Sequence, residues 1–114
     1  MIAILSLTLT FLYPVAIDGD TFKWGNERVR LWGINAPEIN TSEGRVSATE
    51  LRYLIEDHEL VCEKKGVDGY GRTVAQCWNE AGEDIACIMV GMGLADDWSY
   101  FSHGYYKECE NEYQ

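Results

Sequence analysis

The sequence has little positive charge and few residues that interrupt a folded chain. Its 114 residues include nine lysines and arginines against nineteen aspartates and glutamates, a formal net charge of −10. Proteins that bind nucleic acid through many phosphate contacts usually carry a basic face, so this charge argues against a broad interface but leaves room for a local basic cleft. Two prolines, eleven glycines and the absence of low-complexity segments argue against disorder and fit short strands joined by tight turns.

A zinc motif is also lacking. The four cysteines, Cys62, Cys77, Cys87 and Cys109, form no CxxC pair, and neither histidine lies close enough in sequence to complete a zinc pattern. An even number of widely spaced cysteines in a short chain favours disulfides and an oxidising compartment. We therefore expect an exported protein, periplasmic or extracellular; the alternative is a cytoplasmic protein with four buried thiols.

No apolar run is long enough to cross a membrane. The longest, Ile2 to Leu12, falls well short of the roughly 20 residues that a spanning helix needs, so we expect no stable membrane insertion. It is similar to the apolar part of a signal peptide, although no lysine or arginine precedes it and no clear cleavage site follows. Apolar residues alternating with Thr8 and Thr10 fit a first strand equally well. Both interpretations of residues 1–14 stay open.

Residues 15–114 are expected to form one domain in which strands and helices are interspersed. The predicted elements are strand segments at 15–17, 22–24 and 28–32, a helix at 42–57, strands at 60–63 and 73–78, a short helix from 84 to 90 and a short acidic C-terminal helix. This order indicates an α+β domain with a mainly antiparallel sheet. Strands this short are often closed into a five-stranded barrel of the OB type, which hides their edges.

The cysteine positions test the predicted hairpin. If Cys62 and Cys77 oppose each other, the turn centres inside the predicted loop at residues 68–72. Directly opposed residues of antiparallel strands have Cα atoms about 4.5–5.5 Å apart, within reach of a disulfide. Cys87 and Cys109 would then tie the second helix to the C-terminal one.

Five side chains could serve the hydrolysis of a phosphodiester bond. That reaction needs a metal held by oxygen ligands, a positioned water, and cations over the phosphoryl oxygens. Ca²⁺ prefers carboxylate and carbonyl oxygens, arginines neutralise charge on phosphate, and a nearby carboxylate can deprotonate water. Taken singly, each side chain is explained equally well by a turn or a solvated loop. The five are Asp18, Asp20, Arg30, Glu38 and Arg72.

Three motifs in this order resemble the staphylococcal nuclease family: Ile17–Thr21 (IDGDT), Val29–Glu38 (VRLWGINAPE) and Asp68–Arg72 (DGYGR). Gly93–Ala95 (GLA) is also similar to that family, and the resemblance covers about residues 15 to 110. It implies a single domain with an OB-type barrel and three helices. It also implies Ca²⁺-dependent cleavage of DNA or RNA with little base specificity.

The resemblance implies a role for each matching residue. By position, Arg30 and Arg72 resemble the two arginines that contact the scissile phosphate. Glu38 resembles the carboxylate that acts on the attacking water. The aromatic residues expected to hold substrate are Tyr70, which matches a motif position, and Trp98 and Tyr100, which could stack on a base.

The implied metal site departs from the family pattern. Asp20 resembles a ligand aspartate, and backbone oxygens, with Ala36 in the ligand set, complete the expected site. Asn35 stands where the second ligand carboxylate is expected, so the site loses one negative charge and should bind Ca²⁺ more weakly. Gly69 likewise stands where a lysine near phosphate is expected.

Two functions therefore remain. The first is a monomeric nuclease that acts on DNA or RNA. The second is a catalytically weak or inactive OB-fold module that binds nucleic acid or a protein partner, which the acidic charge and Asn35 favour. The retained pair of arginines and Glu38 favours the nuclease.

Overall fold

The protein has one five-stranded sheet, described here from a computed structural model that covers residues 13–110 and residue 112. The two interpretations of the N-terminal segment fall on residues 1–12, outside the described residues. The strands of the sheet, in spatial order, are β1 (Val15–Ala16), β2 (Thr21–Trp24), β3 (Glu27–Leu31), β6 (Thr73–Trp78) and β5 (Val61–Val67). A separate pair is formed by β4 (Ile34–Asn35) and β7 (Asp96–Asp97). The helices are α1 (Ser42–Ile55), α2 (Ile85–Gly91), α3 (Ser99–Ser102) and the 3₁₀ turn η3 (Lys107–Cys109).

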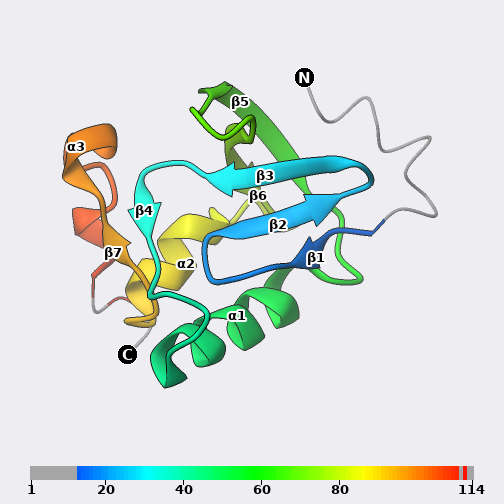
Figure 1. The fold of residues 1–114 in the computed structure, drawn as a ribbon. Coiled ribbons are helices and arrows are strands. Elements are labelled where there is room, and N and C mark those ends of the chain that lie inside the picture. Colours follow the sequence, from blue (N-terminus) through cyan, green and yellow to red (C-terminus); the bar gives the residue numbers. More distant parts are fainter. Residues whose placement is uncertain (1–12, 111, 113–114) are drawn as a thin grey trace.

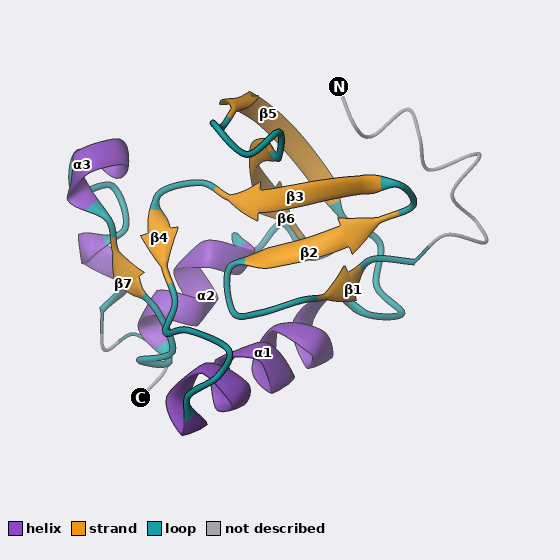
Figure 2. Ribbon diagram, viewed as in Figure 1, coloured by secondary structure: helices purple, strands orange, loops and turns teal. Residues whose placement is uncertain are grey.

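The expected α+β fold of the OB type is confirmed, with one difference in the sheet. Three strand pairs are antiparallel, whereas β3 and β6 run parallel, with Arg30 opposite Val74. Parallel neighbours need a long crossover connection, and here the chain between them contains α1 and β5. This pairing places β6 beside β3 in the sheet (Figures 1 and 2), so residues near 30 and residues near 74 become neighbours.

Helix α1 begins as predicted and ends two residues early. The Thr41 hydroxyl caps it by accepting a hydrogen bond from the Gly44 amide. The helix ends at Ile55 because Glu56 is extended and Asp57 adopts a left-handed backbone with φ of 65°. α1 packs against β1 and α2, and α2 in turn packs against β6 and η3 (Figure 1).

The core lies between the sheet and these helices. It is built from side chains that are almost fully buried. Burying apolar surface contributes about 25 cal/mol of folding free energy per Å² removed from water. Within the described residues, no helix combines the length and apolarity needed to cross a membrane. The largest fully buried side chains include Phe22, Leu31, Ile34, Leu51, Ile55, Met89 and Tyr106.

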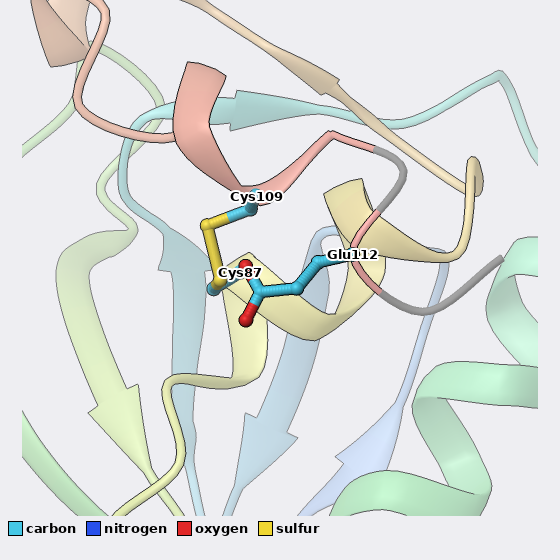
Figure 3. A group of neighbouring side chains, drawn as sticks. All are labelled: Cys87, Cys109 and Glu112. Atoms are coloured by element: carbon cyan, nitrogen blue, oxygen red, sulfur yellow. A yellow bond between two sulfur atoms is a disulfide. The ribbon is translucent and has the colours of Figure 1, made fainter.

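Both expected disulfides are present. Cys62 opposes Cys77 in the β5–β6 ladder, with Cα atoms 4.0 Å apart. Cys87 of α2 is bonded to Cys109 of η3, with Cα atoms 5.4 Å apart (Figure 3). The hairpin is longer than predicted, since β5 continues to Val67. The C-terminal helix is reduced to the short segments α3 and η3.

Candidate active site

A polar cavity of about 230 Å³ brings together the residues expected to act on phosphate, water and metal. They come from three separated stretches: the loop before β2, residues 30–38 from β3 into the loop after β4, and the turn of the β5–β6 hairpin. Trp98, which follows β7, adds an aromatic side chain. The parallel pairing of β3 with β6 is what places the last stretch beside the second. The lining residues are Asp18, Asp20, Arg30, Asn35, Ala36, Pro37, Glu38, Arg72 and Trp98.

Asp20 is the buried carboxylate of this cavity, with 7% of the residue exposed. One oxygen, Oδ2, accepts a 2.7 Å hydrogen bond from the Ala36 amide and lies 3.5 Å from Arg30 Nη2. The other accepts a hydrogen bond from the Thr21 hydroxyl. Burial, reinforced by the neighbouring Asp18 carboxyl, raises the pKa of Asp20 to about 6 even though Arg30 and the Ala36 amide oppose the shift.

The loop that carries Asp20 lies flat against its surroundings because residue 19 has no side chain. A Cβ added to Gly19 would come within 2.6 Å of the Ser47 Cβ and 2.7 Å of the Ala36 Cβ, closer than packed atoms allow. The loop is also closed by the Asp18 carboxylate, which accepts a hydrogen bond from the Asp20 amide. Because residue 19 is glycine, the loop that carries both aspartates can pack closely against α1 and Ala36.

Glu38 combines a fixed backbone with an exposed side chain. Its carbonyl accepts hydrogen bonds from both the amide and the hydroxyl of Thr41. The same carbonyl rests on the first turn of α1 so closely that a Cβ added to Gly44 would overlap it. The backbone at Glu38 is thus fixed, and its exposed side chain lines the cavity, where it can contact water.

Arg30 is buried on β3. The alternation of side chains along a strand does not by itself explain a charged residue at a buried position. Its Nη1 donates a 2.7 Å hydrogen bond to the Leu31 carbonyl, and its Nη2 faces Asp20. The guanidinium carbon lies 5.6 Å from the centre of the Trp98 ring. These contacts hold the cation in one orientation at the wall of the cavity.

Arg72 enters from the hairpin turn and is oriented by Asp68. Its Nε donates a 2.6 Å hydrogen bond to one Asp68 oxygen, while the amides of Arg72 and Tyr70 donate to the other. The Tyr70 ring lies 5.2 Å from the guanidinium carbon. One aspartate therefore shapes the turn and positions its arginine.

The oxygen ligands around the cavity fit a hard cation such as Ca²⁺. Asp18, Asp20, Asn35 and Glu38 all present carboxylate or amide side chains to it. The raised pKa of Asp20 is the electrostatic signature of a buried carboxylate that a bound cation would stabilise. The set has the chemistry of a hard-cation site in which position 35 carries an amide instead of a carboxylate.

A second group of potential ligands gives no metal site. Cys87, Cys109 and Glu112 lie close together, but the two sulfur atoms are bonded to each other (Figure 3). A disulfide offers no thiolate, which is the form of cysteine that binds metal. Their proximity reflects a structural cross-link.

An apolar groove of about 450 Å³ adjoins the polar cavity and shares Arg30, Arg72 and Trp98 with it. Its aromatic residues come from β3, the hairpin turn and the α3 region, so Tyr70 and Trp98 lie where substrate is expected. Tyr100 does not: it is 79% exposed and lines neither space. The aromatic residues of the groove are Trp32, Tyr70, Trp98 and Phe101.

Sequence reasoning missed Phe101 as a wall of the groove. Its ring meets that of Trp98 edge to face at 4.6 Å. The signal was available in the spacing, since residues three apart in a helical turn share a face and adjacent residues do not. Trp98 and Phe101 satisfy that spacing, whereas Tyr100 falls on the outer side.

A comparison with known families identifies this arrangement. The family model described as staphylococcal nuclease homologue matches residues 28–114, more than half of the chain. The chain belongs to the staphylococcal nuclease family. The match includes Arg30, Glu38 and Arg72 and begins after Asp20.

A curated protein is similar in sequence to most of this chain. The succinoglycan biosynthesis protein ExoI of Rhizobium meliloti (strain 1021) is 32% identical over 105 residues, an alignment that covers 82% of this chain. The alignment covers 55% of the relative, so the chain spans about half the length of that protein.

Proposed function

We propose that this protein is a Ca²⁺-dependent nuclease that hydrolyses phosphodiester bonds in DNA or RNA with low base specificity. The observation that carries the proposal is the convergence of two arginines, a buried aspartate and an exposed glutamate on one polar cavity. The adjoining groove supplies local positive charge in a chain of net charge −10, because it is lined by three basic residues and one acidic residue and because salt screens more distant acids.

In the proposed reaction, Glu38 orients the attacking water and takes its proton as the new P–O bond forms. The P–O bond to one sugar oxygen breaks in the same step, and this leaving oxygen takes up a proton from solvent. Arg30 and Arg72 stabilise the negative charge that develops on the phosphoryl oxygens. Arginine has five N–H donors, and pairing with Asp68 uses the Nε of Arg72. Arg30 uses one N–H of Nη1 for the Leu31 carbonyl and directs Nη2 at Asp20. Both arginines therefore keep donors with which to contact phosphate.

The side chains of Asp20 and Asn35 and the backbone carbonyl of Ala36 are the proposed metal ligands. Bound Ca²⁺ would polarise a phosphoryl oxygen and add positive charge to the site. With an amide at position 35, the site carries one charge fewer than a two-aspartate site, so its affinity for Ca²⁺ is lower.

We further infer that the protein works as a monomer in an oxidising, extracytoplasmic compartment. Two disulfides in a chain of this size support that location. The relative's name assigns that protein to succinoglycan biosynthesis.

A non-catalytic nucleic-acid-binding module is the second candidate. Asn35 favours it, because a weakened metal site limits hydrolysis while leaving the arginines able to bind phosphate. Intact positioning of the Glu38 backbone by Thr41 and α1 favours the nuclease.

Cleavage of fluorescent single-stranded DNA and RNA, with Ca²⁺, Mg²⁺ or chelator, tests the proposal. We expect metal-dependent cleavage that falls about 10²–10³-fold in Arg72→Ala, the usual loss for a missing electrostatic donor. Arg28→Ala is the matched control, since Arg28 is an exposed arginine outside both cavities. Folded protein that binds an oligonucleotide but cleaves none with any metal would favour the binding module.

A further inference from the structure

Lys65 lies in the groove rather than in solvent beside it. Its Nζ sits 5.0 Å from the centre of the Trp32 ring, a cation–π distance, and both residues line the groove together with Arg30 and Arg72. About a third of the Lys65 side chain is exposed, at 32%. The aromatic ring therefore holds the ammonium group along the groove wall while leaving it able to contact a ligand.

The backbone is irregular at this lysine. In the β5–β6 ladder Lys64 opposes Ala75 and Gly66 opposes Val74, so Lys65 is the extra residue of a β-bulge. Bulges re-aim side chains and are common next to active sites. The neighbouring Lys64 does not line the groove. The bulge thus selects one of two adjacent lysines for this position.

The groove concentrates positive charge in an acidic protein. Three of the nine lysines and arginines line it, and the acidic residue that lines it, Asp68, is paired with Arg72. Lys65 is paired with Glu63, whose side chain is 64% exposed. Such a solvent-exposed pair is weak and can exchange for a phosphate. The groove therefore suits an anionic chain.

We propose that Lys65 binds the phosphate next to the scissile one in a single strand that leaves the active site through the groove. This inference rests on the proposed function. Arg30 and Arg72 line both the polar cavity and the groove, whereas Lys65 lines the groove and not the cavity. A strand whose scissile phosphate contacts the arginines carries its next phosphate toward Lys65. The intervening base meets the aromatic wall of the groove.

Binding without turnover tests this role. The background is Glu38→Gln with Ca²⁺, and the probes are fluorescein-labelled octathymidylate, followed by anisotropy, and thymidine 5′-monophosphate, followed by calorimetry. We expect Lys65→Gln to weaken octamer binding by about 3- to 10-fold and to reduce the salt slope by roughly 0.7, the value for one phosphate contact on a single strand. Binding of the mononucleotide should not change. Lys65→Arg should retain octamer affinity, and Lys64→Gln is the matched control.

Each other outcome has a distinct meaning. Equal losses from Lys64→Gln and Lys65→Gln would show a general charge effect and overturn the inference. So would an octamer affinity unaffected by Lys65→Gln, or an equal loss of mononucleotide binding, while the proposed function stood. A folded Glu38→Gln parent that binds neither probe would instead reject the proposed function itself.

Discussion

The polar cavity and the apolar groove share three residues but are built in opposite ways. In the cavity, Asp20 is buried and hydrogen-bonded to backbone, and Gly19 and Gly44 allow contacts too close for any side chain. In the groove, three of the four aromatic residues are exposed, Tyr70 at 83%, Phe101 at 46% and Trp98 at 40%, and Trp32 is partly buried. Bond cleavage requires reacting groups in fixed positions, whereas base stacking tolerates variation. The difference suggests that the cavity sets rate and the groove sets affinity.

The largest expected effect concerns the charge buried in the cavity. The pKa of Asp20 is raised to about 6, so in chelator the native state holds a proton that the unfolded state releases. This stabilisation is complete below about pH 4, the unfolded value, and is lost as the pH rises through 6. Relative to Asp20→Asn, the wild type should lose at most about 3 kcal/mol of unfolding free energy between pH 4 and 7.

Urea unfolding of both proteins across this pH range measures the difference. All other carboxylates are common to the two proteins, so the difference between their unfolding free energies at each pH contains only the contribution of Asp20. Adding Ca²⁺ at pH 7 should recover stability in the wild type more than in the variant. A pH-independent difference between the two would show that Asp20 titrates normally and that the cavity is more open than its contacts indicate.

A second test moves the backbone of Glu38 without changing its chemistry. In Gly44→Ala the new methyl group would overlap the Glu38 carbonyl, so the loop must shift. A displacement of about 1 Å at a reacting group can lower the rate 10²-fold, or about 2.7 kcal/mol. We expect that loss in kcat with little change in affinity for an oligonucleotide.

Val46→Ala is the control for this test, since Val46 is a 53% exposed residue of the same helix and lines neither the cavity nor the groove. Steady-state kinetics and anisotropy on both variants separate rate from affinity. Affinity that fell as much as kcat in Gly44→Ala would contradict the division between cavity and groove.

The smallest expected effect is in the groove. Phe101→Ala removes a wall residue that contacts Trp98, and a stacking contact contributes on the order of 1–3 kcal/mol per base. Because Phe101 is partly exposed, we expect the lower end, a loss of about 5-fold in oligonucleotide affinity with kcat retained. Tyr100→Ala should leave affinity unchanged, and equal effects of the two variants would place Tyr100 in contact with substrate.

Local sequence signals predicted the elements of this fold well. Thr41 and Asp84 cap their helices because side-chain oxygens satisfy the first free amides. Counting along the hairpin placed Cys62 opposite Cys77. The parallel β3–β6 pairing could not be predicted in this way, because it joins distant segments that no local pattern links.

The site residues that belong to specific motifs were predicted, whereas Lys65 and Phe101, which lie outside such motifs, were not. Arg30, Glu38 and Arg72 were singled out through the order of three motifs, and all three line one cavity. No local pattern separates Lys65 from its neighbour Lys64, because the β-bulge between them depends on tertiary packing. Phe101 was missed although its spacing from Trp98 carried the signal. Their positions follow from how β5 and α3 meet the rest of the chain.

The parallel pairing of β3 with β6 has a consequence for how activity arises during folding. Arg30 and Arg72 become neighbours only when these strands meet, across a connection that contains α1 and β5. Non-local pairings form late, because closing a long loop costs entropy before any contact offsets it. If α1 and the hairpin form before β3 and β6 pair, Arg30 and Arg72 do not yet line a common cavity. The proposed nuclease is therefore inactive until its fold is complete.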